Sequence, residues 1–213
     1  MPTGGGKSLC YQLPALLREG TSLVVSPLIA LMRDQVRFLT LAGVKAVALH
    51  SQNTNEEMRL ISEEARTGSL KLLYVAPERL GSSGFLNFIN GLQVSSIVVD
   101  EAHCVSQWGH DFRPDYLKIN SLNVTLGDVQ VVALTATAEP ETQADILKSL
   151  FTKKPKIFLN GVDRPNIRLS CKLKEKPRKQ LLEFIRHQKN QSGIVYCNSR
   201  AKTEVLARAL SES

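Results

Sequence analysis

The feature that most limits the fold of this chain is the alternation of short apolar runs with longer amphipathic stretches. The short runs are rich in β-branched residues and predict strands, whereas apolar residues recur at helical spacing over 29–41, 55–66 and 140–150. The predicted strands are 22–25, 45–49, 71–75, 96–99, 129–134, 157–159 and 194–196. Alternating strands and helices are typical of βαβ crossovers, so we predict an α/β fold with a mainly parallel sheet that helices cover on both faces.

Polar motifs follow several of the predicted strands directly. SPL comes after the first strand, APERL after the third, DEAHC after the fourth and TATA after the fifth. In parallel sheets, ligands bind outside the carboxyl ends of the strands. We therefore expect these motifs to converge on one edge of the sheet.

A glycine-rich stretch, MPTGGGKSLCYQLPALL, opens the sequence. Gly4, Gly5 and Gly6 allow several backbone amides to turn toward one point, Lys7 can reach the outer phosphates of a nucleotide, and Ser8 offers a hydroxyl to Mg²⁺. The alternative is a flexible glycine turn before a helix. Such a loop also needs a buried strand behind it, and none precedes it in this sequence.

A pair of carboxylates ends the apolar run SSIVV. Asp100 would lie where it can hold a hydrated Mg²⁺, and Glu101 where it can orient and deprotonate a water in line with the γ-phosphate. The alternative is an exposed acidic turn. Adjacent acids at a strand tip destabilise the fold unless a cation is near, which favours the nucleotide site.

His103, Cys104 and His110 raise the alternative of a metal site. Their spacing matches no structural zinc pattern, and the neighbouring carboxylates already have a use. We interpret His103 as a polar coupler between the nucleotide site and its surroundings.

The composition excludes several protein classes. Hydrophobic residues make up 43% of the chain, which argues against disorder. No apolar run approaches the roughly 18–20 residues of a membrane span. Cysteines stand far apart at 10, 104, 171 and 197, without a Cys-x-x-Cys pair, so we expect reduced thiols in a cytoplasmic protein.

Positive charge is concentrated in the last part of the sequence. The net charge is +7, but residues 152–213 hold fifteen Lys or Arg against five Asp or Glu. A basic segment fits an anionic polymer, and a solvated linker would have the same composition. Charge alone leaves both readings open.

Residues 163–180 have two prolines, many charges and few large apolar residues, which is typical of a connection between domains. We predict a first domain over 1–162, the connection over 163–180, and over 181–213 the beginning of a second α/β unit that is too short to close a sheet.

Seven motifs together resemble those of one family. MPTGGGKS, SPLIALMRDQV, APERL, DEAHCVSQWGHDFRPDY, LTATA, DRPNI and GIVYCNSRAK are similar, in this order, to the motifs of RecQ DNA helicases, a branch of superfamily 2. The resemblance runs from end to end of the chain and implies a RecA-like first lobe, followed by the start of a second. It also implies missing parts: an adenine-recognition motif upstream, and an arginine motif, a zinc-binding region and a winged helix downstream.

The resemblance implies ATP and Mg²⁺ as cofactors and assigns roles to residues. Catalysis would fall to Lys7, Asp100, Glu101 and His103, and metal binding to Ser8 and Asp100. ATP binding would involve Thr3, Gly4, Gly5, Gly6, Lys7 and Ser8. DNA contact or coupling would involve Ser26, Pro27, Arg33, Gln35, Arg79, Gln107, Trp108, His110, Phe112, Arg113, Thr135, Thr137, Asn198, Ser199 and Arg200. For the Ser, Thr and Pro residues, the alternative of a helix cap or turn stays open.

The segment CVSQWGHDFRPDY places several aromatic residues beside Arg113. Aromatic faces stack on unpaired bases and arginine neutralises phosphate, so the segment predicts contact with single-stranded DNA. The alternative is a loop whose aromatic side chains fill the core. In the RecQ family, this loop is thought to sense single-stranded DNA and to signal to the ATP site.

We therefore expect the parent protein to be an ATP-dependent 3′–5′ DNA helicase acting on single-stranded and forked DNA in repair and recombination, and this chain to be inactive alone. The alternatives are an RNA helicase, a translocase that does not unwind, or a remnant that only binds nucleotide or DNA. The sequence identifies no protein partner and indicates no membrane contact. The cytoplasm or nucleoid of a bacterium, or a nucleus, is the expected compartment.

Overall fold

The computed structural model describes residues 4–108, 111–159, 161, 166–188 and 190–211. The chain divides into two compact units, residues 1–163 and 164–213. Each unit is described by itself.

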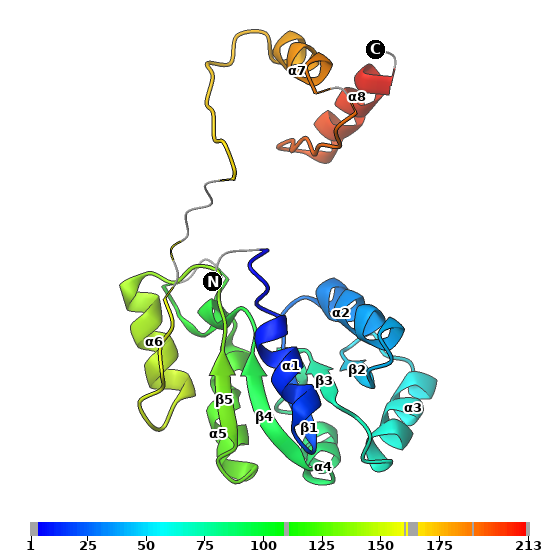
Figure 1. Ribbon diagram of the computed structural model, residues 1–213, viewed down its shortest axis with the longest axis vertical. Coiled ribbons are helices and arrows are strands. Elements are labelled where there is room, and N and C mark those ends of the chain that lie inside the picture. The colour runs from blue at the N-terminus through cyan, green and yellow to red at the C-terminus, as the bar shows by residue number, and fades with distance from the viewer. Residues whose placement is uncertain (1–3, 109–110, 160, 162–165, 189, 212–213) are drawn as a thin grey trace. The chain divides into compact units, whose positions relative to one another are not determined.

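The first unit contains a five-stranded parallel sheet in the order β2-β3-β1-β4-β5 (Figure 1). Its strands are β1 (Thr21–Val25), β2 (Ala46–Leu49), β3 (Leu72–Val75), β4 (Val94–Val99) and β5 (Gln130–Ala133). Val25 lies opposite both Val75 and Val99, and the register between β1 and β4 shifts once, between Thr21 and Ser22. This sheet confirms the predicted parallel α/β fold.

Helices connect the strands and cover both faces of the sheet. They are α1 (Leu9–Leu17), α2 (Ile29–Leu41), α3 (Asn55–Arg66), α4 (Ser83–Asn90), α5 (Lys118–Thr125) and α6 (Pro140–Leu150), with short 3₁₀ turns η1 (Pro77–Arg79), η2 (Ala102–Val105) and η3 (Pro114–Leu117). Their starts follow local chemistry. Thr54 and Glu57 form a reciprocal capping box before α3, and Ser82 caps α4.

Two hydrophobic clusters lie on opposite faces of the sheet because successive strand residues point in opposite directions. Val24 packs with α1 and α2, whereas Leu23 and Val25 pack with α3, α4, α5 and α6. The central strand β1 is buried along its whole length. The sheet is therefore a rigid base for the loops at its carboxyl edge.

The second unit has two helices in its described part, α7 (Pro177–Arg186) and α8 (Arg200–Ser211). The strands predicted at 157–159 and 194–196 were wrong, since neither segment is a strand. Side chains there are largely exposed, with Phe158 at 72% and Tyr196 at 89%. A strand needs a hydrogen-bonded neighbour, and in the described residues every sheet partner lies between 21 and 133.

Candidate functional site

The strand ends are tied together at one edge of the sheet. The amide of Asp100 donates to the carbonyl of Val25 at 2.9 Å, and the amide of Ala102 donates to that of Leu134 at 2.9 Å. The amide of Ser26 donates to Val75 at 3.1 Å. The segments after β1, β4 and β5 thus meet at one edge, as their positions in the sequence predict.

The glycine-rich loop lies immediately before α1. Gly4 and Gly6 adopt φ values of 77° and 79°, a region that residues with a Cβ rarely occupy. The first turn of α1 closes back on the loop, with the amide of Leu9 donating to Gly6 at 3.0 Å. The loop therefore has the backbone conformation and the helix N-terminus that an anion site needs. Thr3 lies outside the described residues.

Lys7 reaches from this loop to the tip of β4. Its Nζ lies 3.4 Å from Glu101 Oε1, and the two side chains are only 14% and 24% exposed. The motifs GGGKS and DEAH are 94 residues apart in sequence and meet through this ion pair.

Asp100 and Glu101 occupy different environments at the end of β4. Asp100 is 8% exposed, and burial, followed by the charge of Glu101, raises the pKa of its carboxyl group. Glu101 has a left-handed backbone (φ 47°, ψ 48°), and its amide donates to Asp100 Oδ1 at 3.0 Å. A non-glycine residue in this conformation is strained, and such strain gathers at functional sites.

His103 joins the acid pair to the segment after β5. Its Nδ1 lies 3.0 Å from Thr135 Oγ1 and 3.3 Å from Glu101 Oε2. Thr135 donates in turn to the carbonyl of Thr137 at 2.9 Å. The histidine thus lies between the acid pair and the segment after β5, and its role as a coupler stays a prediction.

The aromatic segment after the DEAH motif separates into an exposed part and a buried part. Trp108 is 80% exposed and Gln107 is exposed, whereas Tyr116 is fully buried and donates to the carbonyl of Asp100 at 3.0 Å. Phe112 is half-buried. His110 lies outside the described residues. The core-filling alternative therefore holds for Tyr116 and fails for Trp108.

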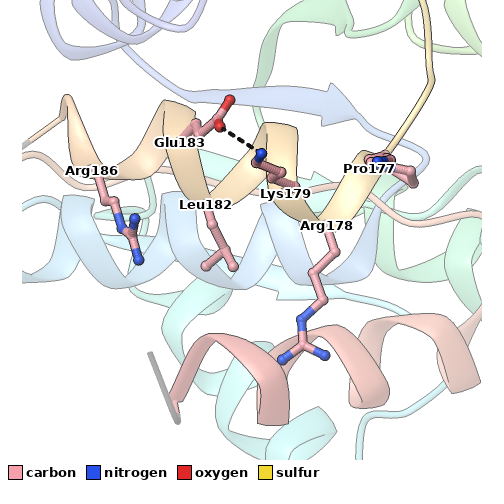
Figure 2. Close-up of a pocket in the computed structure, with 7 residues that line it drawn as sticks. Pro177, Arg178, Lys179, Leu182, Glu183 and Arg186 are labelled. Atoms are coloured by element: carbon pink, nitrogen blue, oxygen red, sulfur yellow. Dashed lines mark ion pairs between the residues drawn. The ribbon is translucent and has the colours of Figure 1, made fainter.

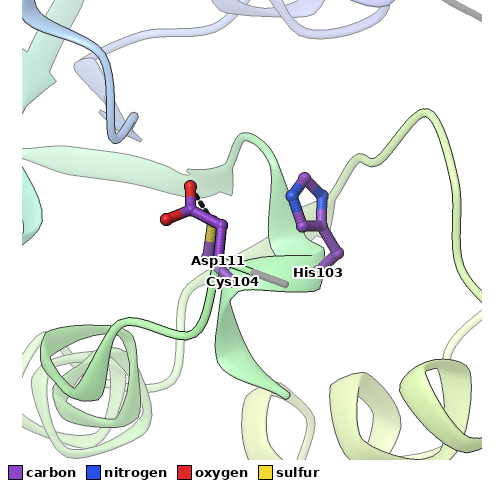
Figure 3. Close-up of side chains that lie close together, drawn as sticks. All are labelled: His103, Cys104 and Asp111. Atoms are coloured by element: carbon purple, nitrogen blue, oxygen red, sulfur yellow. Dashed lines mark hydrogen bonds between the residues drawn. The ribbon is translucent and has the colours of Figure 1, made fainter. Parts of the chain in front are cut away.

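Cys104 and Asp111 lie beside His103, and one ligand atom from each of the three side chains lies within 4.8 Å of the others (Figure 3). Burial, followed by the charge of Asp111, raises the pKa of the Cys104 thiol to about 12. Cys104 donates to Asp111 Oδ2 at 3.7 Å, and hydrogen bonds from Arg113 lower the pKa of Asp111. These contacts favour a hydrogen-bonded structural cluster over a metal centre.

Several residues expected along the DNA path make internal contacts. Ser26 and Pro27 are buried, and the carbonyl of Pro27 accepts a hydrogen bond from Arg113. Arg33 Nε lies 3.4 Å from His50 Nε2, and Arg79 Nη2 lies 3.8 Å from Met58 Sδ.

Gln35 belongs to a polar network that the sequence did not predict. It accepts a hydrogen bond at 2.7 Å from Gln12 on α1, and Gln12 also lies 3.2 Å from the hydroxyl of Tyr74, which is 3.3 Å from that of Tyr11. This network connects the helix after the glycine-rich loop to α2. The only advance signal was a glutamine on an otherwise apolar helix.

In the second unit, Ser199 accepts a hydrogen bond from the amide of Lys202 at 3.3 Å and so acts as a cap for α8. Asn198 and Arg200 beside it are exposed. The helix-cap alternative therefore describes the local role of Ser199.

A glycine-rich loop before a helix, with its lysine against a carboxylate pair at a strand tip, defines the phosphate-binding-loop class of nucleotide-binding proteins. The chain belongs to the DEAD/DEAH box helicase family, whose family model matches residues 1–146.

Individual relatives are more specific. The chain is 48% identical over 210 residues to the ATP-dependent DNA helicase RecQ of Pasteurella multocida, covering 99% of this chain and 33% of that protein. It is 43% identical over 205 residues to the protein of the same name from Bacillus subtilis, covering 96% of this chain and 35% of that protein. The chain thus spans about a third of the length of the curated relatives it matches.

Solved structures support the fold. The helicase MrfA bound to DNA and AMPPNP matches with a TM-score of 0.72 at 19% identity, covering 100% of this chain and 33% of that one. The Mycobacterium smegmatis helicase Lhr, bound to single-stranded DNA and AMP-PNP, matches with a TM-score of 0.66 at 21% identity, covering 99% of this chain and 31% of that one. Among the helices that the structure describes, none is long and apolar enough to cross a membrane.

Proposed function

We propose that the chain forms the ATP-binding part of a RecQ-type helicase that uses ATP hydrolysis to move 3′ to 5′ along single-stranded DNA and to open forked duplexes in repair and recombination. In this proposal residues 1–162 are the first RecA-like lobe, 163–180 the connection and 181–213 the start of the second lobe. It would act where the cell keeps its DNA, in a bacterial cytoplasm or nucleoid, or in a nucleus.

The ion pair between Lys7 and Glu101 is the observation that carries the proposal, because it brings the phosphate-binding and water-activating groups to one place. The donor set also fits Mg²⁺, which prefers hard oxygen ligands. Asp100 has a buried carboxyl group with a raised pKa, so a cation would relieve its burial, and Ser8 supplies a hydroxyl at the start of α1.

Mg²⁺-ATP, when bound, supplies a γ-phosphoryl group that a water can attack in line. Lys7 would leave Glu101 for the outer phosphates, and Gly4, Gly5 and Gly6 would direct amides toward them. Asp100 and Ser8 would hold the cation. Glu101, released from Lys7, would orient the water and accept its proton.

Contacts of His103 and Arg113 would connect the ATP site to the segment that contacts DNA. His103 contacts both Glu101 and Thr135, and Arg113 donates to the carbonyl of Pro27, in the motif after β1. Trp108 is exposed on the same segment, where an unpaired base could stack on it. A shift of Glu101 when the γ-phosphate binds would therefore be passed through His103 and the segment of Arg113 and Trp108 to the residues on the DNA path.

ATP turnover in a protein extended to the length of the relatives tests the proposal, with and without single-stranded DNA. Lys7→Ala should abolish turnover, whereas Lys45→Ala, which removes an exposed cation paired with Glu64, should leave it unchanged. Turnover by the Lys7 variant at the wild-type rate would refute the nucleotide site. Stimulation by RNA in place of DNA, or translocation without strand separation, would favour the other family activities.

A further inference from the structure

Helix α7 carries a cationic side that none of the motifs above includes. Arg178, Leu182 and Arg186 are spaced four residues apart and project to the same side of the helix (Figure 2). Together with Lys176 and Lys179 they line a shallow hollow of about 470 Å³, which Pro177 and Glu183 complete. We call Lys176, Arg178, Lys179 and Arg186 the α7 cationic surface.

The charges of this surface are poorly compensated. Among the described residues that line the hollow, Glu183 is the one acidic side chain, and it lies 3.9 Å from Lys179 in an exposed pair. Exposed ion pairs of this kind contribute little to the stability of a helix and neutralise the lysine charge only weakly. Within the described residues, Lys176, Arg178 and Arg186 take part in no ion pair.

The cations at the start of α7 oppose the stability of the helix, whereas Arg186 stands in the last turn, where the helix dipole favours a cation. Arg178 and Lys179 stand in the first turn of α7, where the helix dipole favours anions, and that turn contains no acidic residue. Lys176 at the N-cap supplies no side-chain hydrogen bond. Cations in the first turn of a helix, with no anionic partner, are unfavourable, and unfavourable local features of this kind are often found at functional surfaces. A bound anion would neutralise these charges and interact favourably with the helix N-terminus.

A second hollow lies between α7 and α8. Leu181 lines it with Val205, Leu206 and Ala209 of α8, and Arg178 lines both this hollow and the cationic one. Lys176, Lys179 and Arg186 line only the cationic hollow, and all three are exposed. None of the described residues that line the cationic hollow is aromatic, so the hollow suits phosphates rather than stacked bases.

We propose that the α7 cationic surface binds the phosphate backbone of DNA without reading its sequence. Arg178 and Arg186 are about 12 Å apart along the helix axis, at 1.5 Å per residue, so they would engage different phosphates of one DNA molecule. The proposal rests on the proposed DNA helicase function and adds a contact outside the helicase motifs.

DNA affinity of the 213-residue chain, measured by fluorescence anisotropy without nucleotide over a series of salt concentrations, tests the proposal. The probes are oligothymidylate and a DNA duplex of equal length, which distinguish single-stranded from duplex backbone. The test variant is Arg178→Glu/Arg186→Glu. The matched control is Lys153→Glu/Lys154→Glu, which changes the net charge equally at exposed positions in the loop after α6.

We expect the test variant to bind at least one probe about ten-fold more weakly than the wild type. The slope of log binding constant against log salt concentration should become shallower by about 1.4 to 1.8, because two phosphate contacts are lost. The control should change neither value by as much. Arg178→Glu places an acid in the first turn of α7, which the helix dipole favours, and Arg186→Glu places one in the last turn, which it opposes. The two effects offset each other, so helicity by circular dichroism should be kept while DNA binding falls, and this result would separate a binding role from a structural one.

The same loss in test and control, an unchanged salt slope, or no DNA binding by the wild-type chain would overturn the proposal. An unchanged affinity would leave an acidic protein as the better partner for this surface. Because the assay contains no nucleotide, its failure is distinguishable from failure of the ATP site, which the Lys7 variant reports.

Discussion

Arg113 Nη1 donates a hydrogen bond to the main-chain carbonyl of Pro27 at 3.1 Å, across 86 residues of sequence. The same guanidinium lies 3.2–3.3 Å from both carboxylate oxygens of Asp111. One side chain therefore ties the segment after the DEAH motif to the segment after the central strand. Because a guanidinium has five donors in a fixed fork, it can satisfy both partners at once.

Arg113→Lys should uncouple DNA binding from ATP turnover. Lysine keeps the charge, but a single ammonium cannot hold both Asp111 and the Pro27 carbonyl in this geometry. In the extended protein we expect turnover without DNA to stay within about two-fold of wild type, and stimulation by single-stranded DNA to fall about ten-fold, the effect of losing about 1.4 kcal/mol. Arg37→Lys on the exposed side of α2 is the control, and full stimulation in the Arg113 variant would contradict the coupling role.

Glu101→Gln and Asp100→Asn should separate water activation from metal binding. Glu101→Gln keeps the buried Asp100, so nucleotide should bind while turnover falls about a hundred-fold or more. Asp100→Asn should lose Mg²⁺-dependent nucleotide binding itself. Equal loss of nucleotide affinity in the two variants, measured with a fluorescent ATP analogue, would contradict this division.

Asp100 should also make the stability of the fold depend on pH. The folded pKa of Asp100 lies above the ordinary 3.8, so the metal-free folded state holds a proton that the unfolded state releases. Stability from this group is present below pH 3.8 and is lost as pH rises through the raised folded value. Asp100→Asn should remove that loss, so denaturant midpoints of the two chains should diverge as pH rises, with the variant more stable.

Trp108 and Tyr116 should respond in opposite ways to substitution. Trp108 is 80% exposed, so Trp108→Ala should leave the melting temperature almost unchanged while weakening stimulation by single-stranded DNA. Stacking of one base is worth about 1–3 kcal/mol. Tyr116 is fully buried, so Tyr116→Phe should cost about 1 kcal/mol through its lost bond to Asp100, and Tyr116→Ala about 3–5 kcal/mol. A Trp108 variant that unfolds would restore the core-filling alternative.

Local patterns predicted the elements of the first unit well because each carries its own signal. The helices expected at 29–41, 55–66 and 140–150 coincide with α2, α3 and α6. The expected strands at 157–159 and 194–196 failed, since pairing depends on a neighbour that local composition does not encode. Of all the strand predictions, these two stand outside the five-stranded sheet.

The candidate site shows the same limit at the level of side chains. The motifs predicted that Lys7 and Glu101 act at one nucleotide site, but not that the two side chains pair. The contact of Gln35 with DNA stays a prediction, and the hydrogen bond that it accepts from Gln12 was not expected. The hydrogen-bond partner of a polar side chain depends on packing between segments that are far apart in sequence. Local sequence patterns do not encode this packing.

Cysteine reactivity offers a test of the structure that needs no ligand. Cys10 and Cys171 are exposed, whereas Cys104 is buried and its thiol has a pKa of about 12, raised by burial and by the charge of Asp111. The thiolate is the reactive form, so at pH 8 iodoacetamide should modify Cys10 and Cys171 within minutes while Cys104 stays unmodified. In denaturant Cys104 should react like the others.

Mass spectrometry of tryptic peptides measures modification at each cysteine separately. The control is Cys104→Ser, which should show no adduct on that peptide under either condition. Modification of Cys104 in the folded chain at the rate of Cys10 would mean that the segment between the DEAH motif and Arg113 opens readily, which would also remove the basis for the Arg113–Pro27 coupling.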